Sequence, residues 1–331
     1  MARMTSPDVG LQRRLSRICD RDGLIRTAAI DHPENYDLLF DEDLSQVDFA
    51  EVVDSKLELI AAMSQHASSL LLDPRAAFGQ AVMTGAAPGD VGILSGLEEL
   101  YHVPGTTDFE PRLGLRPGWD PEKLVSLGVD AAKLVVFHRH VDEAALADKV
   151  ALVEEVAARC HALHLPLVVE PLWYPVAGED VADPAIRAQR TASVLSTAAT
   201  FKGAGADIMK VEFPVNLATN ADDADAACAK LAEACGGTWV LLSAGVTFDG
   251  FLEQMKVAVR HGCSGFMAGR AIWGDGVGRF GAERRAAGVR TACERLDKLA
   301  EVLHTNPHPA LTKVPVPEAA QVIGPDWYRT A

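Results

Sequence analysis

Two charged side chains, Lys210 and Glu212, interrupt the otherwise largely apolar stretch 206–215, which reads ADIMKVEFPV. Residues two apart in a strand point to the same side, so both side chains belong to one face. A charge in a short hydrophobic strand is costly unless it is paired or used in chemistry. A desolvated lysine loses part of its preference for the charged form, which suits an amine that attacks a carbonyl. The stretch therefore indicates either a nucleophilic lysine or a lysine at a strand end that is solvated or paired with Glu212.

Other polar residues also stand at or near the ends of apolar runs. Asp31 and Glu170 each follow one, whereas Lys133 lies inside the run AAKLVVF. Asp73, followed by Pro74, is expected to act mainly as a structural residue at the start of the next helix. Three consecutive predicted strands carry two lysines and two glutamates, Lys133, Glu170, Lys210 and Glu212. This is more buried charge than a protein usually needs for structure alone. We therefore expect a functional site that includes these four residues, whereas Asp31 either belongs to this site or caps the next helix.

A second type of signal follows the last two predicted strands, where the residues are small. Ser243-Ala244-Gly245 ends one strand and Gly269-Arg270 ends the next. Backbone N–H groups at such ends often bind phosphate in parallel barrels, and an arginine can bind a phosphate with two parallel hydrogen bonds. Ser243, Gly245, Gly269 and Arg270 are therefore the predicted phosphate-binding residues. The alternative is that Gly269 only permits close packing.

A metal site is not predicted, and neither is a cofactor. The ten histidines include no HExxH motif. His32, His138 and His140 are the possible exceptions. His138 and His140 follow the fourth predicted strand, so their side chains are expected near the mouth of the barrel. A polar loop explains the last two more simply than a divalent metal does.

Alternation of apolar runs with helical patterns predicts the elements that position these residues. Eight strands are expected at 24–30, 68–72, 91–94, 131–137, 165–169, 206–211, 238–242 and 265–268. Helices are expected at 11–22, 45–67, 121–127, 142–163, 184–203, 221–235, 248–261 and 283–303. This order predicts an α/β protein with a single (β/α)8 TIM barrel, about 24–303, within one domain 1–331. A doubly wound sheet is the alternative, but no glycine-rich turn follows the first strand.

The segments outside the barrel are a short N-terminal helix and a C-terminal tail, 304–331, that has five prolines and is expected to wrap around the surface. The net charge of −15 disfavours general binding to nucleic acids or to anionic membranes. No membrane span or signal peptide is predicted. The six cysteines show no CxxC spacing, which favours reduced thiols and a cytoplasmic location.

The chain resembles the class I aldolases that include tagatose-1,6-bisphosphate aldolase and sulfofructose-phosphate aldolase. The matching segments occur in the family's order over about 24–275, and the most specific are KVE-x-PVN at 210–216 and LSAGV at 242–246. The others are Ala29-Ile30-Asp31, Leu71-Leu72-Asp73-Pro74, Asp130-Ala131-Ala132-Lys133, Val169-Glu170 with Tyr174, and Ser264-Gly265 with Ala268-Gly269-Arg270-Ala271-Ile272-Trp273.

This resemblance implies a role for each matching residue. Lys210 is expected to form the Schiff base, Glu170 to act as acid and base, and Lys133 to be a second active-site lysine. Asp31 is expected to contact substrate hydroxyls. The residues Ser243, Gly245, Gly269 and Arg270 are expected to hold the dihydroxyacetone-phosphate end.

One part of the family pattern is missing. Where tagatose-bisphosphate aldolases have Gln-Arg-Gly after the first aspartate, this chain has His32-Pro33-Glu34. Either Lys56 or Arg75 replaces the lost positive charge, or the aldehyde half of the substrate carries no phosphate.

The predicted function is a class I aldolase that cleaves a ketose phosphate, in carbohydrate catabolism, and that forms a homo-oligomer. Two alternatives remain open. One is another Schiff-base or phosphate-binding barrel enzyme, such as an isomerase or dehydratase. The other is a non-catalytic sensor of a sugar phosphate that acts through a protein partner, although a sensor needs no nucleophilic lysine.

Overall fold

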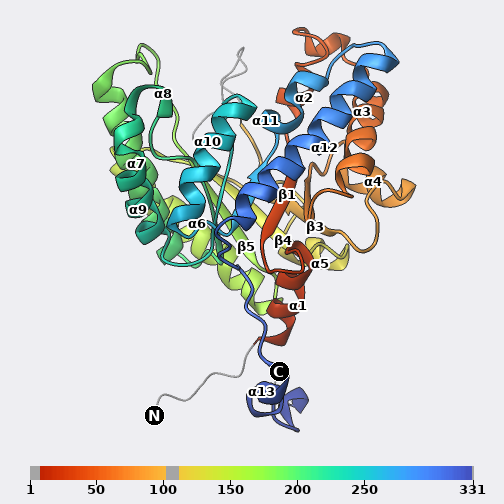
Figure 1. Cartoon of the computed structure of the whole chain (residues 1–331), viewed down its shortest axis with the longest axis vertical. Coiled ribbons are helices and arrows are strands. Elements are labelled where there is room, and N and C mark those ends of the chain that lie inside the picture. The colour runs from red at the N-terminus through yellow and green to blue at the C-terminus, as the bar shows by residue number, and fades with distance from the viewer. Residues whose placement is uncertain (1–7, 102–111, 330–331) are drawn as a thin grey trace.

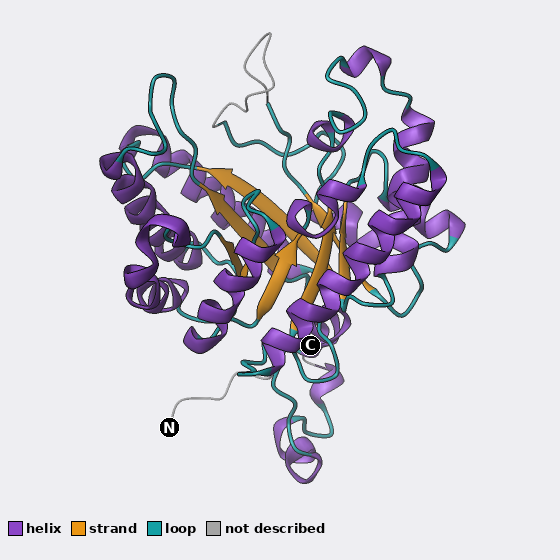
Figure 2. Ribbon diagram, turned by 45° about the horizontal axis from the view of Figure 1, so that its top comes forward, coloured by secondary structure: helices purple, strands orange, loops and turns teal. Residues whose placement is uncertain are grey.

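The computed structural model describes residues 8–101 and 112–329. Its centre is a closed barrel of eight parallel strands in which each strand pairs with the next and β8 returns to β1 (Figure 2). The predicted (β/α)8 TIM barrel is confirmed, and the doubly wound alternative is wrong. The strands are β1 (Ile25–Ile30), β2 (Ser69–Leu72), β3 (Gly92–Gly96), β4 (Ala131–Phe137), β5 (Leu167–Leu172), β6 (Ile208–Val211), β7 (Trp239–Leu241) and β8 (Gly265–Ala268).

Helices surround the barrel, and α1 lies below it, at the end where the strands begin (Figure 1). The longer helices around the barrel are α3 (Phe49–Met63), α6 (Glu143–Ala162), α7 (Pro184–Gly203), α9 (Ala224–Cys235), α10 (Phe248–Ala258) and α12 (Ala282–His304). The shorter ones are α1 (Val9–Ile18), α2 (Glu34–Asp37), α4 (Phe78–Thr84), α5 (Pro121–Ser126), α8 (Leu217–Asn220), α11 (Arg270–Trp273) and α13 (Val316–Val322). None of the helices in the described ranges is long and apolar enough to cross a membrane.

Side chains alternate along each strand between the barrel interior and the surrounding helices. A layer of buried apolar residues fills the interior toward the start of the strands, and it is separate from the larger core between strands and helices. This inner apolar layer is formed by Ile25, Ala29, Leu71, Leu94, Ala131, Val168, Ile208, Val240 and Met267. Residues two positions later on the same strands point into the barrel one layer higher.

Strand β5 runs further than predicted, because Pro171 does not end it. Pro171 pairs with Val136 of β4, and the strand continues to Leu172. A proline is harmful in a strand when it removes a ladder hydrogen bond. Pairing between β5 and β6 involves only Val168 and Val169, so the missing N–H of Pro171 falls beyond that ladder.

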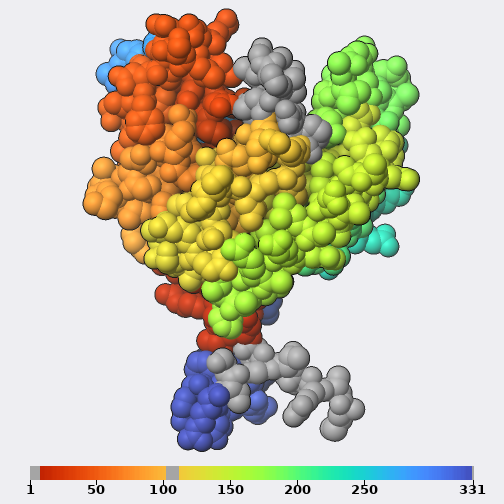
Figure 3. All heavy atoms as spheres, turned by 180° about the vertical axis from the view of Figure 1, so that it is seen from behind, coloured from red at the N-terminus to blue at the C-terminus, as the bar shows by residue number. Residues whose placement is uncertain are grey.

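The N-terminal helix and the tail also differ from the prediction. Helix α1 spans Val9–Ile18, because the side chain of Asp8 caps its start and Cys19 adopts an extended conformation. The tail packs on the barrel through Leu311, near the glycine turn at Gly23, whose carbonyl accepts the N–H of Ala310. Beyond this point most residues of the tail are exposed, and α13 projects below the barrel (Figure 3). The tail therefore does not wrap around the surface.

Candidate active site

Lys133, Glu170 and Lys210 point into the barrel directly above the inner apolar layer. Each follows a residue of that layer by two positions on β4, β5 and β6, so strand alternation alone places them on the same face. All three side chains are almost fully buried. The prediction that these strands bring the two lysines and this glutamate together agrees with the structure.

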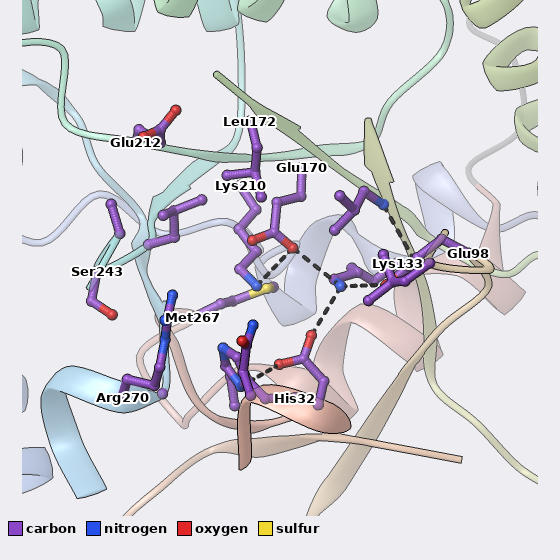
Figure 4. A pocket seen from close by; sticks show the side chains of 18 of the residues that line it. His32, Glu98, Lys133, Glu170, Leu172, Lys210, Glu212, Ser243, Met267 and Arg270 are labelled. Carbon is purple, nitrogen blue, oxygen red and sulfur yellow. Dashed lines mark hydrogen bonds and ion pairs between the residues drawn. The ribbon is translucent and has the colours of Figure 1, made fainter. Parts of the chain in front are cut away.

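Glu170 lies between the two lysines and pairs with both. Its Oε2 atom is 2.9 Å from Nζ of Lys210 and 3.2 Å from Nζ of Lys133 (Figure 4). A carboxylate at hydrogen-bond distance from an amine is positioned to exchange a proton with a group bound to that amine. The arrangement therefore provides a nucleophile and an acid–base group at one point of the barrel.

Lys133 is held by three carboxylates. Its Nζ lies 2.6 Å from Glu98, 2.9 Å from Asp31 and 3.2 Å from Glu170. Burial opposes the charge of Lys133, but the surrounding carboxylates outweigh it and hold its pKa well above the usual range. Lys133 is therefore a fixed cation.

Glu98 is the site residue that the sequence prediction missed. The third strand was expected to end at Leu94, whereas β3 continues to Gly96, and Glu98 follows two residues later. Its carboxylate also accepts the backbone N–H of Val135 at 3.3 Å. The period of two through Leu94, Gly96 and Glu98 could have indicated that Glu98 points into the barrel. It becomes visible only when the third strand is continued beyond Leu94.

Asp31 follows β1 and is buried beside Lys133. Burial disfavours its ionised form, but the charges of Lys133 and Lys210 prevail and hold the pKa of Asp31 far below its usual range. Its Oδ1 atom has no hydrogen-bond partner in the described part of the chain. Asp31 lines the pocket, and its predicted contact with substrate hydroxyls stays a prediction.

His32 lies beside Asp31, with Nδ1 3.4 Å from the Asp31 Oδ1 atom. Its ring packs edge-on against Trp273 at a centroid distance of 5.6 Å. Burial lowers the pKa of His32 to about 4, and the positive charge of Arg270 adds to this effect although Asp31 opposes it. His32 is therefore neutral near pH 7.

Glu212 does not pair with Lys210, although both side chains start from the same face. Strand β6 ends at Val211, and the Glu212 carboxylate lies 3.0 Å from Arg190 and accepts the backbone N–H of Trp173. Figure 4 shows Glu212 above the pocket and away from the Lys210 amine. The simple alternative of a Lys210–Glu212 pair is therefore wrong.

The predicted phosphate-binding residues lie together on the side of the barrel formed by β7 and β8. Ser243, Gly269 and Arg270 line the pocket. Gly245 has a φ of +75°, and a Cβ atom there would lie 3.8 Å from the Arg270 guanidinium. A Cβ at Gly269 would lie 2.6 Å from the carbonyl oxygen of Ala29, so only glycine fits this position. Gly269 therefore permits close packing, which was the alternative considered for it, and it also lines the pocket.

Neither Lys56 nor Arg75 reaches this pocket. The Nζ of Lys56 is fully buried, 2.8 Å from Asp73, and donates to the carbonyl of His32. Arg75 pairs with Asp37 at 2.5 Å. Both side chains hold the loop after β1 in place, so the expectation that one of them replaces the missing charge is wrong. Asp73 has the structural role that was predicted for it, because it also accepts the N–H of Arg75.

The histidines considered as metal ligands have other surroundings. His138 is buried with its ring against Phe201, and His140 contacts Ser193 through Nδ1 at 2.7 Å. Within residues 8–101 and 112–329, no group of three or more His, Cys, Asp or Glu side chains is arranged to hold a metal ion.

These groups line a pocket of about 350 Å³ at the end of the barrel where the strands terminate. Ser243 and Arg270 lie on one side, Lys133 and Glu98 lie on the other, and Lys210 and Glu170 lie between them (Figure 4). This is the end at which barrel enzymes carry their active sites. The pocket can therefore hold an anionic group at one end while a carbonyl carbon lies beside Lys210.

Comparisons with known proteins show the family of the chain. Residues 27–275 match the profile of the DeoC/LacD family aldolase. The chain is 28% identical to tagatose 1,6-diphosphate aldolase 1 of Enterococcus faecalis over 316 residues, which cover 88% of this chain and 94% of the relative. It is 25% identical to tagatose 1,6-diphosphate aldolase 2 of Streptococcus mutans over 326 residues, which cover 91% and 97%.

Solved structures show the same fold. An archaeal fructose 1,6-bisphosphate aldolase aligns with a TM-score of 0.58 and 18% identity, covering 89% of this chain and 99% of that one. A fructose-bisphosphate aldolase from Plasmodium falciparum aligns with a TM-score of 0.65 and 13% identity, covering 92% and 96%.

Proposed function

Because this chain belongs to the DeoC/LacD family of aldolases and is a class I carbon–carbon lyase, we propose that it cleaves a ketose phosphate reversibly into dihydroxyacetone phosphate and an aldehyde. The observation that carries this proposal is the 2.9 Å contact between the Lys210 amine and the Glu170 carboxylate at the bottom of an open pocket. Family membership favours carbon–carbon cleavage over the isomerase, dehydratase and sensor alternatives.

The reaction begins when the neutral amine of Lys210 attacks the C2 carbonyl of the ketose. The carbinolamine hydroxyl takes up a proton and leaves as water, which gives an iminium ion that withdraws electrons from the C3–C4 bond. Glu170 accepts the proton of the C4 hydroxyl as this bond breaks, and the bonding electrons pass to the iminium to form an enamine. The aldehyde leaves, the enamine is protonated at C3, and hydrolysis releases dihydroxyacetone phosphate and regenerates the Lys210 amine.

The other residues position and stabilise the reacting atoms. Lys133 is a cation 3.2 Å from Glu170, so this ion pair holds the Glu170 carboxylate in place beside Lys210. Lys133 also stabilises negative charge on oxygen during carbinolamine formation. Asp31 offers its unpaired oxygen to a substrate hydroxyl.

The phosphate end lies at β7 and β8. Ser243 and the backbone around Gly245 and Gly269 supply hydrogen-bond donors, and Arg270 supplies positive charge. In this proposal the dihydroxyacetone-phosphate half, with its phosphate on C1, binds at this end, and the aldehyde half extends toward Lys133 and Glu98, which lie across the pocket from Arg270 in Figure 4.

Borohydride trapping with dihydroxyacetone phosphate, followed by peptide mass mapping, tests the proposal. We expect a single reduced adduct on Lys210. An adduct on another lysine would refute the assignment of the nucleophile, and a folded protein without any adduct would refute this donor.

The cellular setting is also a proposal. All six cysteines are free thiols, which suits an enzyme of sugar catabolism in the cytoplasm. The homo-oligomer stays a prediction, and sedimentation of the full chain measures its size.

A further inference from the structure

The two ends of the substrate pocket differ in charge. The end formed after β7 and β8 has Ser243, Gly269 and the guanidinium of Arg270. We call the lining around Lys133 the far wall. It is formed by Asp31 and Glu98, which pair with Lys133, and by Leu100, Val135, Phe137 and Leu172, which come from the segment after β3, from β4 and from β5. The far wall therefore offers two carboxylates and otherwise apolar side chains.

The cations that line the pocket are not free to bind a second anion. Lys133 is surrounded by three carboxylates, and Lys210 is the proposed nucleophile. His32 is neutral near pH 7, because its pKa is about 4. Arg270 lies at the other end of the pocket (Figure 4). None of the four basic side chains that line the pocket is therefore left to bind an anion at the far wall.

Cations outside the pocket do not change this balance. Arg116 does not line the substrate pocket: it borders a cavity of about 10 Å³ that Asp31, Glu98 and Leu100 of the far wall also line, and it pairs with Glu99 at 3.8 Å. Arg112 stacks on the ring of Tyr101 at 3.5 Å. Arg139 packs beyond Trp173 and pairs with Glu179 at 2.7 Å. The segment 102–111, which lies outside the described residues, contains no lysine or arginine in its sequence.

A second phosphate on the substrate would have to lie against this far wall. It would meet the carboxylates of Asp31 and Glu98, and none of the described residues that line the pocket offers a free cation there. Asp31 remains an anion, because its pKa is held far below the usual range. Like charges placed together at a desolvated site strongly disfavour binding.

From this charge distribution we infer that the aldehyde half of the substrate carries no phosphate or other anionic group, so the substrate is a ketose 1-monophosphate. The inference rests on the proposed function, because it takes the reaction and the phosphate end from it. The apolar residues Val135, Phe137 and Leu172 suit the carbon chain of a neutral aldehyde, and Asp31 accepts a hydrogen bond from its hydroxyl groups.

Condensation of dihydroxyacetone phosphate with a matched pair of aldehydes tests this inference. D-glyceraldehyde and D-glyceraldehyde 3-phosphate differ only in the phosphate, and the L-enantiomers cover the opposite stereochemistry. With the full chain, we expect kcat/KM for the neutral aldehyde to exceed that for the phosphorylated one by on the order of 100-fold. Equal rates, or faster condensation of the phosphorylated aldehyde, would overturn the inference.

Trapping of the donor separates this result from a failure of the proposed function. If dihydroxyacetone phosphate forms a borohydride-reducible adduct on Lys210 and the phosphorylated aldehyde still reacts well, only the far-wall inference fails. If no adduct forms on the folded enzyme, the proposed donor fails and the inference fails with it.

A new cation on the far wall tests whether charge is the cause. Leu100→Arg should narrow the preference for the neutral aldehyde by about tenfold, whereas Leu100→Met, the uncharged control, should leave the ratio unchanged. Leu172→Lys, with Leu172→Met as its control, repeats the test from β5 if Leu100→Arg does not fold. An unchanged ratio in a folded cationic variant would overturn the inference.

Discussion

The Nζ atom of Lys133 lies 2.6 Å from Oε1 of Glu98, and the same carboxylate accepts a backbone hydrogen bond from β4 at Val135. Glu98 is therefore tied to the strand that carries Lys133 as well as to its amine. This contact, together with Asp31 and Glu170, keeps Lys133 charged and in place beside the proposed acid–base residue.

Glu98→Gln should weaken the ion pairs that hold Lys133 in place. With one carboxylate fewer, the pKa of Lys133 falls from its raised position, so the variant should lose activity at a lower alkaline pH than the wild type. We also expect kcat to fall on the order of tenfold, with a smaller change in KM. The measurement is the pH profile of kcat and kcat/KM. Glu99→Gln, which removes the neighbouring carboxylate that pairs with Arg116, is the matched control. Identical profiles for the two variants would contradict a positioning role.

Lys210→Met should abolish turnover while the fold is retained. Methionine fills similar space but has no amine, so kcat should fall on the order of 10⁴-fold or more. Circular dichroism and the aldol cleavage rate are the measurements. Lys256→Met is the control, because this lysine is exposed on α10 and pairs with Glu253. Retention of most activity by Lys210→Met would show that another group is the nucleophile.

Lys56→Met should destabilise the protein without removing any group that lines the pocket. The substitution leaves Asp73 buried without its amine partner, which typically costs about 3–5 kcal/mol. Urea unfolding measures the change in the free energy of unfolding. Lys256→Met again serves as the control, because an exposed ion pair contributes less than about 1 kcal/mol. Equal stability of the two variants would mean that the buried pair contributes no more than a surface pair.

The pH dependence of stability should include a contribution from His32. Its pKa is about 4 in the folded protein and about 6.5 in an unfolded chain, so between these values only the unfolded chain binds the proton. Stability is therefore fully present above pH 6.5 and falls as the pH decreases, by about 1–2 kcal/mol at pH 5 for this residue.

Urea unfolding of the wild type and of His32→Gln at pH 7 and pH 5 checks this contribution. The variant should lose less stability than the wild type over this interval. His138, whose pKa is also lowered by burial, is present in both proteins and cancels in the comparison. Equal losses would exclude His32 as the source. Asp31 contributes at lower pH, because its pKa is depressed and its stabilisation is lost as the pH falls below about 4.

Much of the site was determined by the sequence, because the period of two along a strand is a local property of the chain. Once the apolar runs around Lys133, Glu170 and Lys210 are recognised as consecutive parallel strands, their side chains must face one interior at similar heights. The small residues around Ser243 and Gly269 likewise mark the ends of β7 and β8, where the backbone is open to a ligand. Strand order and the barrel follow from the same alternation.

Only the tertiary structure determines which charged side chains form ion pairs. Strand register and the true strand ends set these distances, and both depend on packing between segments far apart in the sequence. They place Glu98 on Lys133, 35 residues away, and turn Glu212 toward Arg190 instead of Lys210. They also bury Lys56 against Asp73, so the missing positive charge is not replaced from α3. The sequence contained these residues, but their partners depend on long-range geometry that no local pattern records.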